Sequence, residues 1–222
     1  LGYEAEIKMD NNVVIVPFGL EKTVSYGKGT RYGPEEIIKA SHQVELFDEE
    51  LKKEPYKSIG IKTLKPFKIK NNIKDAITQL SNLNKEININ KAINQIAGIN
   101  KKVLDNKLFP ITLGGEHSIT PGAIKPFAEK YEELVLLHFD AHADLRDEYN
   151  GEKFSHASAI KRCLDFKNVK VISFGIRNLS IDEMNFYEKN KDRINIFWSK
   201  DKEKWNMDDI KKNFLNKNVY IT

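Results

Sequence analysis

Three side chains able to bind a metal ion stand at alternate positions in the pentapeptide Asp-Ala-His-Ala-Asp, which runs from Asp140 to Asp144. It follows an apolar run, residues 134–139, that is typical of a buried strand. In extended backbone, alternate side chains leave on one side, so Asp140, His142 and Asp144 are expected to converge. Two carboxylates and an imidazole suit a divalent ion, and a carboxylate can bridge two ions. The alternative is a solvated polar junction, which the motif alone does not exclude.

Another candidate ligand follows a different predicted strand. Residues 107–113 run into Gly114 and Gly115, and His117 comes two residues later. The glycines let the backbone turn sharply out of the strand. In open α/β sheets, ligands gather at the carboxyl ends of strands. A lone histidine after two glycines is more often structural, but with the Asp140–Asp144 segment His117 completes a coherent metal site.

The other histidines and the single cysteine have different expected roles. His138 lies within its strand, so we expect a buried, hydrogen-bonded histidine and no ligand. His156 stands at the start of a helical segment, and an imidazole pKa of about 6.5 suits it for proton transfer; the alternative is a surface residue. We assign no role to His42. Cys163 lies in the helical stretch and is expected in the core.

Short runs rich in Val and Ile alternate with helical patterns, which predicts a parallel sheet covered by helices. The predicted strands are residues 12–17, 107–113, 133–139, 168–174, 194–198 and 218–222. A helix is expected to begin at Gly33, because Pro34 suits a first helical turn. The apolar period over residues 72–104 predicts two helices. Residues 200–205 are expected to form an exposed loop.

Length and composition restrict the class of protein. The 222 residues support one domain over residues 1–222. Lys and Arg number 36 against 32 Asp and Glu, a net charge of +4 that is too small and dispersed to indicate nucleic-acid binding. No apolar run approaches the roughly 20 residues of a membrane span, and the N-terminal residues lack a signal-peptide pattern. One cysteine fits a reducing compartment, so we expect a cytoplasmic protein.

Taken together, the motifs resemble those of the ureohydrolase family, which includes arginase and agmatinase. Residues 114–118, Gly-Gly-Glu-His-Ser, are similar to the family's Gly-Gly-Asp-His-Ser motif, with Glu in place of Asp. Residues 139–144 resemble its Asp-Ala-His-x-Asp motif, and residues 155–157 resemble the histidine segment that follows. Residues 24–34 and 174–177 also resemble the family. The resemblance therefore covers nearly the whole chain and is closest to agmatinases.

The resemblance implies a fold, a cofactor and a role for each candidate residue. The implied fold is a three-layer α/β/α sandwich with a mostly parallel, arginase-like sheet. The implied cofactor is a pair of Mn²⁺ ions. His117 and Asp144 would bind one ion and His142 the other, while Asp140 would bridge both. Water activated between the ions would attack a guanidinium carbon, and His156 would donate a proton toward the departing amine.

The family has a further Asp-x-Asp motif, after a strand that residues 219–222 resemble. We expect that motif, and the C-terminal strands of the fold, to lie beyond this chain. The 222-residue form would then bind metal weakly or at one position. The resemblance also implies a homo-oligomer, a trimer or a hexamer.

Agmatine is the expected substrate, with putrescine and urea as products, because residues 145–153 look more like an agmatinase loop than the Asn-rich loop of arginases. The acids Asp147, Glu148 and Glu152 would meet the distal ammonium, or else serve as ordinary solvated charges. Arginase, guanidinobutyrase and formimidoylglutamase activities stay open within the family. Outside it, the alternatives are a single-zinc amide hydrolase of the related deacetylase group and a noncatalytic, incomplete homologue acting as a binding or assembly partner.

Overall fold

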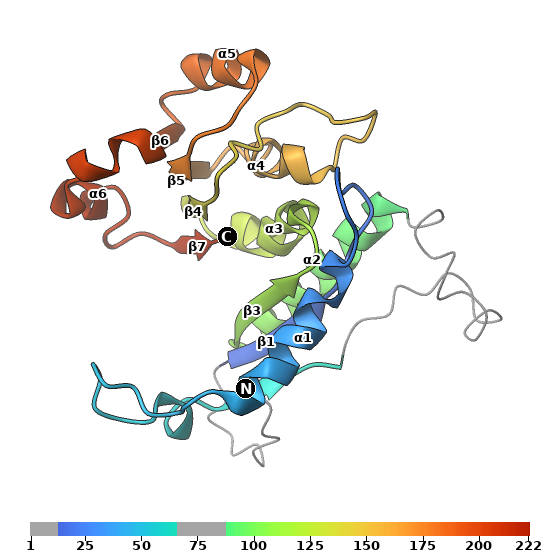
Figure 1. The fold of residues 1–222 in the computed structure, drawn as a ribbon, viewed down its shortest axis with the longest axis vertical. Helices are drawn as coiled ribbons and strands as arrows, with labels where there is room; N and C mark the ends of the chain where they lie inside the picture. The colour runs from blue at the N-terminus through green and yellow to red at the C-terminus, as the bar shows by residue number, and fades with distance from the viewer. Residues whose placement is uncertain (1–12, 66–87) are drawn as a thin grey trace. The chain divides into compact units, whose positions relative to one another are not determined.

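The computed structural model describes residues 13–65 and 88–222. The chain forms two compact units, Leu1–Ile119 and Thr120–Thr222. Each unit has its own parallel sheet among the described residues (Figure 1). No helix in the described ranges is long and apolar enough to cross a membrane.

The first unit holds a three-stranded parallel sheet in the order β2-β1-β3. Its strands are β1 (Val13–Phe18), β2 (Ile61–Thr63) and β3 (Phe109–Gly114). The central strand β1 is buried from Val14 onward, as expected for Val-rich sequence between two neighbours. The short strand β2 was not predicted, because three residues are too few to show a period.

Two helices pack on the strands of this unit: α1 (Gly33–Ala40) contacts β1 and β3, and α2 (Ile89–Asp105) contacts β3. Pro34 occupies the first turn of α1, as predicted. The Asn88 side chain caps α2 by accepting a hydrogen bond of 3.0 Å from the Lys91 N–H. The buried face of α2 is Ile89, Ala92, Ile93, Ile96, Ala97, Asn100 and Val103. The single-turn helices are η1 (Thr30–Tyr32), η2 (Ser41–Gln43), η3 (Pro55–Lys57) and η4 (His117–Ile119).

Of the two helices predicted over residues 72–104, α2 is confirmed. The other falls on residues 72–87, which lie outside the described part of the chain.

The second unit holds a four-stranded parallel sheet in the order β6-β5-β4-β7. The strands are β4 (Leu134–Phe139), β5 (Val169–Ile176), β6 (Ile194–Trp198) and β7 (Val219–Ile221). The helices are α3 (Thr120–Lys130), η5 (His156–Ser158), α4 (Ala159–Cys163), α5 (Ile181–Lys189), η6 (Ser199–Lys204) and α6 (Met207–Lys212). All six predicted strands are therefore confirmed within about two residues, whereas the loop predicted at residues 200–205 is mostly a 3-10 helix.

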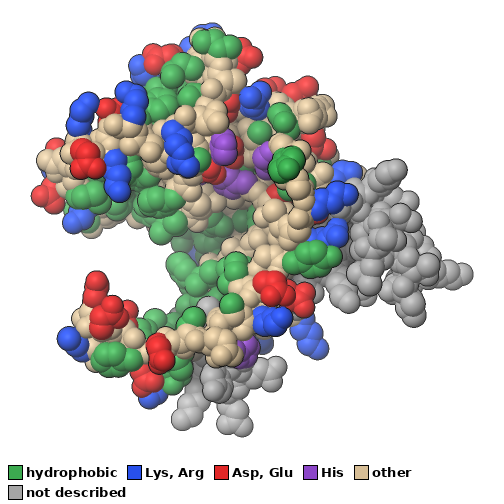
Figure 2. Space-filling view, in the orientation of Figure 1, with side chains coloured by type: hydrophobic (Ala, Val, Ile, Leu, Met, Phe, Trp, Pro, Cys, Tyr) green, Lys and Arg blue, Asp and Glu red, His purple; other side chains and the backbone are tan. Residues whose placement is uncertain are grey.

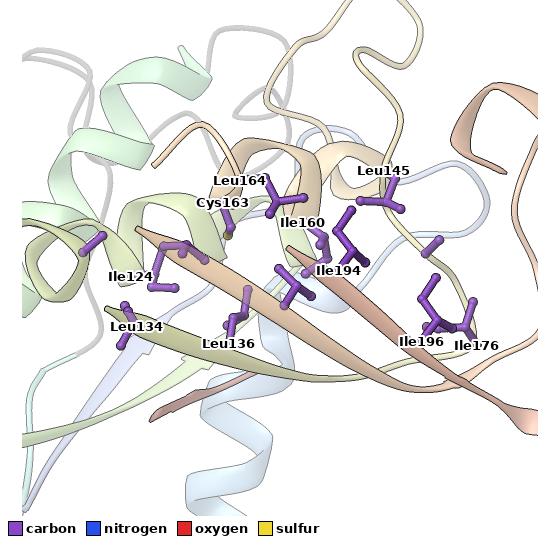
Figure 3. Close-up of a cluster of buried hydrophobic side chains, with 14 residues drawn as sticks. Ile124, Leu134, Leu136, Leu145, Ile160, Cys163, Leu164, Ile176, Ile194 and Ile196 are labelled. Carbon is purple, nitrogen blue, oxygen red and sulfur yellow. The ribbon is translucent and has the colours of Figure 1, made fainter. Parts of the chain in front are cut away.

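Alternation along β4 builds a core on each face of this sheet. Leu134 and Leu136 face Ile124 of α3 and Ile160 of α4 in one buried cluster (Figure 3). The intervening residues Val135 and Leu137 join a second cluster with Ile210 of α6. Helices therefore cover both faces of the sheet, which gives the second unit the predicted α/β/α layering.

Cys163 belongs to the first of these clusters and is fully buried. Burial raises the pKa of its thiol, because the charged thiolate is disfavoured away from water. The prediction that Cys163 is a core residue is confirmed.

Candidate metal centre

Three ligand-type side chains converge at the carboxyl end of β4. His138, Asp140 and Asp144 each offer an atom, and these atoms lie within 4.8 Å of one another. His138 and Asp144 are buried, and the Asp140 side chain is 25% exposed. Two carboxylates this close repel each other unless a cation or a proton offsets their charge. The mixture of carboxylate oxygen and imidazole nitrogen fits a divalent ion such as Mn²⁺.

Asp140 lies between two imidazoles. Its Oδ2 is 3.5 Å from His138 Nε2, and its Oδ1 is 3.4 Å from His142 Nδ1. The backbone N–H of His142 also donates to Oδ1, at 2.9 Å. Each oxygen of Asp140 therefore lies close to a separate imidazole.

The two imidazoles differ in exposure. His138 is fully buried and its Nδ1 lies 3.0 Å from Ser173 Oγ on β5, so the predicted burial and hydrogen bonding of His138 are confirmed. The His142 side chain is 62% exposed. His138 shares the parity of Asp140 along the strand, and its Nε2 lies among the converging groups, although its place inside the strand favoured a structural role.

The loop after β4 is fixed to the backbone that follows β5. Extended structure ends at Phe139. The Ala141 carbonyl accepts the Asn178 N–H at 3.0 Å, and the Ala143 N–H donates to the Asn178 carbonyl at 3.2 Å. These bonds form an isolated parallel bridge between His142 and Asn178. The metal loop, residues 140–144, is thus held in place by backbone pairing with Asn178 and by the side chain of Asp140.

Asp144 reaches the site by a different route from the one that the sequence predicted. The prediction assumed extended backbone and strict alternation, but Asp144 has φ 50, in the left-handed region. Asp adopts this conformation more readily than most non-glycine residues. Its carbonyl accepts the Lys161 N–H of α4 at 3.0 Å. A turn, not strand alternation, brings the Asp144 carboxylate close to Asp140.

His117 ends the first unit in η4, and it is partly buried there. The preceding glycine is required by a close approach of two backbones: a Cβ on Gly115 would lie 2.1 Å from the Leu20 carbonyl oxygen. The next residue, Glu116, is buried, and its Oε2 accepts N–H bonds from Lys22 and Thr23, both at 2.7 Å. The longer Glu in place of the family's usual Asp therefore anchors the segment that follows β1.

We predict that Gly115→Ala destabilises the chain by about 1–3 kcal/mol, because the new methyl group overlaps backbone that cannot move aside cheaply. Gly98→Ala is the matched control. Gly98 lies in α2. Apart from its chain neighbours and the adjacent backbone of its own helix, no atom of the described residues is within 4 Å of the position that its methyl group would take, so alanine there should be neutral or stabilising. Urea unfolding of the two variants checks the difference. Equal midpoints would show that the turn before His117 does not depend on the glycine.

His156 lies at the start of η5, which confirms its predicted place at the start of a helix. Its ring contacts Tyr149 edge to face, with centroids 5.5 Å apart and planes at 75°. The Arg146 guanidinium lies 5.6 Å from the centroid of the Tyr149 ring. Figure 2 shows exposed histidine side chains, coloured purple, on the displayed face of the molecule. The aromatic contact restricts the orientation of the imidazole that was predicted to transfer a proton.

The acids of the same loop have different surroundings. Asp147 Oδ1 accepts a hydrogen bond of 2.7 Å from the buried Arg162 guanidinium. Glu152 Oε1 accepts the Phe154 N–H at 3.2 Å. Glu148 is exposed. Two of the three acids predicted to meet a substrate ammonium are therefore engaged with the protein itself.

Comparison with known proteins identifies the family to which this chain is similar. The model of the arginase family matches residues 11–222. An N(1)-aminopropylagmatine ureohydrolase of Synechocystis sp. is 31% identical over 194 residues, which are 86% of this chain and 58% of that protein. An agmatinase of Bacillus cereus is 34% identical over 178 residues, which are 76% of this chain and 53% of that protein. The chain thus spans little more than half the length of these curated relatives.

Among solved structures, the agmatine ureohydrolase of Thermoplasma volcanium is similar with a TM-score of 0.75 and 26% sequence identity. The match covers 96% of this chain and 66% of that one.

Proposed function

Since the chain belongs to the arginase family and has its α/β fold with parallel sheets, we propose that it hydrolyses agmatine to putrescine and urea at a centre of two Mn²⁺ ions. The observation that carries this proposal is the convergence of Asp140 and Asp144 with an imidazole at the carboxyl end of β4. The family match runs through both units, which supports residues 1–222 acting as one domain.

We assign His117 and Asp144 to one ion, His142 to the other, and Asp140 to both. The distance of 3.4 Å between Asp140 Oδ1 and His142 Nδ1 supports placing these two residues on the same ion, and the bridging role of Asp140 follows from the family resemblance. His142 is preferred to His138 as a ligand because it matches the family motif and is exposed. His138, held by Ser173, would instead fix the direction of the Asp140 carboxylate.

The assignment of His117 rests on residues 114–118, Gly-Gly-Glu-His-Ser, which are similar to the family motif.

When bound, the ions would supply the positive charge that lowers the pKa of a water molecule. The oxygen of a water molecule would form the new bond to the guanidinium carbon, and the bond from this carbon to the alkyl nitrogen would break. The two protons of the water would pass to this nitrogen, one of them delivered by His156, so putrescine would leave as a protonated amine and the rest as urea. Tyr149 packs against the imidazole and limits the directions in which it can deliver the proton.

The choice of agmatine is supported by the relatives, whose names carry agmatine or its aminopropyl derivative. Among the loop acids, Asp147 is neutralised by Arg162. Glu148, exposed on the same loop, is the acid that we propose for the distal ammonium of agmatine. We further propose a cytoplasmic homo-oligomer, in line with the single cysteine and the family resemblance.

The test is urea release by the Mn²⁺-loaded chain from agmatine, N(1)-aminopropylagmatine, arginine, guanidinobutyrate and formimidoylglutamate, the last followed as formamide. We expect the highest kcat/KM with agmatine. A higher kcat/KM with N(1)-aminopropylagmatine would leave the proposed hydrolysis unchanged but would make the longer amine the preferred substrate. Preference for a substrate with a carboxylate would contradict the proposed role of Glu148.

A further inference from the structure

We propose that Glu183 is a positioning residue for the candidate metal centre, because its carboxylate fixes the backbone directly after Asp144. This inference rests on the proposed function, since it assumes that Asp144 binds metal. Glu183 lies in α5, far along the sequence from the metal loop, and only 4% of it is exposed. A carboxylate buried to this degree is expected to satisfy several donors at once.

The two oxygens of Glu183 serve different parts of the chain. Oε2 accepts the Ser180 N–H at 2.7 Å and the Ser180 hydroxyl at 2.8 Å, which completes a capping box at the start of α5. Oε1 accepts the N–H of Leu145 at 3.0 Å. A capping box does not require this second contact, so helix capping alone does not account for the position of Glu183.

Both the side chain and the backbone of Leu145 are held in place. Its side chain is 3% exposed and belongs to the buried cluster that contains Ile160 and Ile176 (Figure 3). Its N–H is taken by Glu183. The next residue, Arg146, donates its N–H to the Ala157 carbonyl at 3.3 Å. The backbone leaving Asp144 is thus fixed by the core, by Glu183 and by the segment that carries His156.

This fixation matters because Asp144 has φ 50. A left-handed conformation at a non-glycine residue costs free energy and persists where the surroundings determine it. The Lys161 N–H holds the Asp144 carbonyl, and Glu183 holds the following N–H. The two contacts bracket Asp144 and set the direction of its carboxylate toward Asp140.

The test compares Glu183→Gln with Ser180→Ala. Glutamine keeps the size of the side chain but has a single acceptor oxygen. The two Ser180 donors are expected to retain that oxygen, so the NH₂ group faces the Leu145 N–H and the Leu145 bond is lost. Ser180→Ala weakens the same helix cap and leaves the Leu145 bond in place. By calorimetry on the metal-free chain, we expect Glu183→Gln to weaken Mn²⁺ binding about 10-fold or more, as for partners of metal ligands elsewhere. Ser180→Ala should stay within about two-fold of the native affinity.

Hydrogen exchange of the Leu145 amide gives a readout that does not need metal. It should lose protection in Glu183→Gln and keep it in Ser180→Ala. If Glu183→Gln does not fold, Glu183→Asp, which keeps the charge and shortens the reach, takes its place with the same expected losses.

Equal losses in the Glu183 and Ser180 variants would overturn the inference, because the residue would then act through the helix cap alone. If Glu183→Gln binds Mn²⁺ as tightly as the native chain, the inference would also be overturned, but the proposed function would stand. A native chain that binds no Mn²⁺ would overturn the proposed function, and this inference with it.

Discussion

Asp140→Asn is expected to lower the affinity of the chain for Mn²⁺ by about 100-fold or more, a larger loss than is usual for residues that only support a ligand. Asp140 is central because its two oxygens face separate imidazoles, those of His138 and His142. Asparagine keeps the shape of the side chain, but it removes the negative charge and one acceptor oxygen. Isothermal titration of the metal-free variant with Mn²⁺ measures the loss.

The matched control for this experiment is Asp192→Asn, an exposed aspartate outside the candidate centre in the same unit. Its affinity should equal that of the native chain. Circular dichroism should show both variants folded, since asparagine is nearly isosteric with aspartate. An Asp140→Asn affinity within about three-fold of native would mean that Asp140 is no ligand, and the assignment of the bridge would be abandoned.

His156→Ala is expected to reduce the turnover of agmatine by about 10²–10³-fold, within the range for loss of a general acid. The same variant should bind Mn²⁺ within about two-fold of native, because His156 is assigned to the proton and not to the metal. Steady-state urea release measures the turnover, and titration with Mn²⁺ measures the affinity.

His42→Ala provides the control, because His42 is an exposed histidine in the first unit and has no assigned role. It should keep native turnover and native Mn²⁺ affinity. Loss of Mn²⁺ affinity in His156→Ala, in parallel with activity, would instead make His156 a ligand and leave the proton donor unidentified.

The strands and layers of the fold were predictable because local sequence carries them. Val- and Ile-rich runs such as residues 134–139 give buried parallel strands, and the apolar period of α2 gives one packed face. The three residues of β2 carry no such period, and a neighbouring strand determines their pairing. The division into two sheets was not visible either, because the sequence does not state which strands pair.

The candidate site was predictable in composition and less so in geometry. The spacing of Asp140 and Asp144 marked them as partners, and the structure brings their carboxylates together. The left-handed turn at Asp144 is flanked by hydrogen bonds to Lys161 and Glu183, which are distant in sequence. The capping-box pattern of Glu183 was readable from the sequence, but its bond to Leu145 was not, because tertiary packing alone creates it.

Crystals of the chain soaked in MnCl₂, with anomalous diffraction recorded at the manganese edge, test the central claim most directly. The account predicts an anomalous peak in contact with the carboxylates of Asp140 and Asp144, with the imidazole of His117 or His142 among its ligands. Manganese bound elsewhere, with no peak at these two carboxylates under saturating metal, would contradict it.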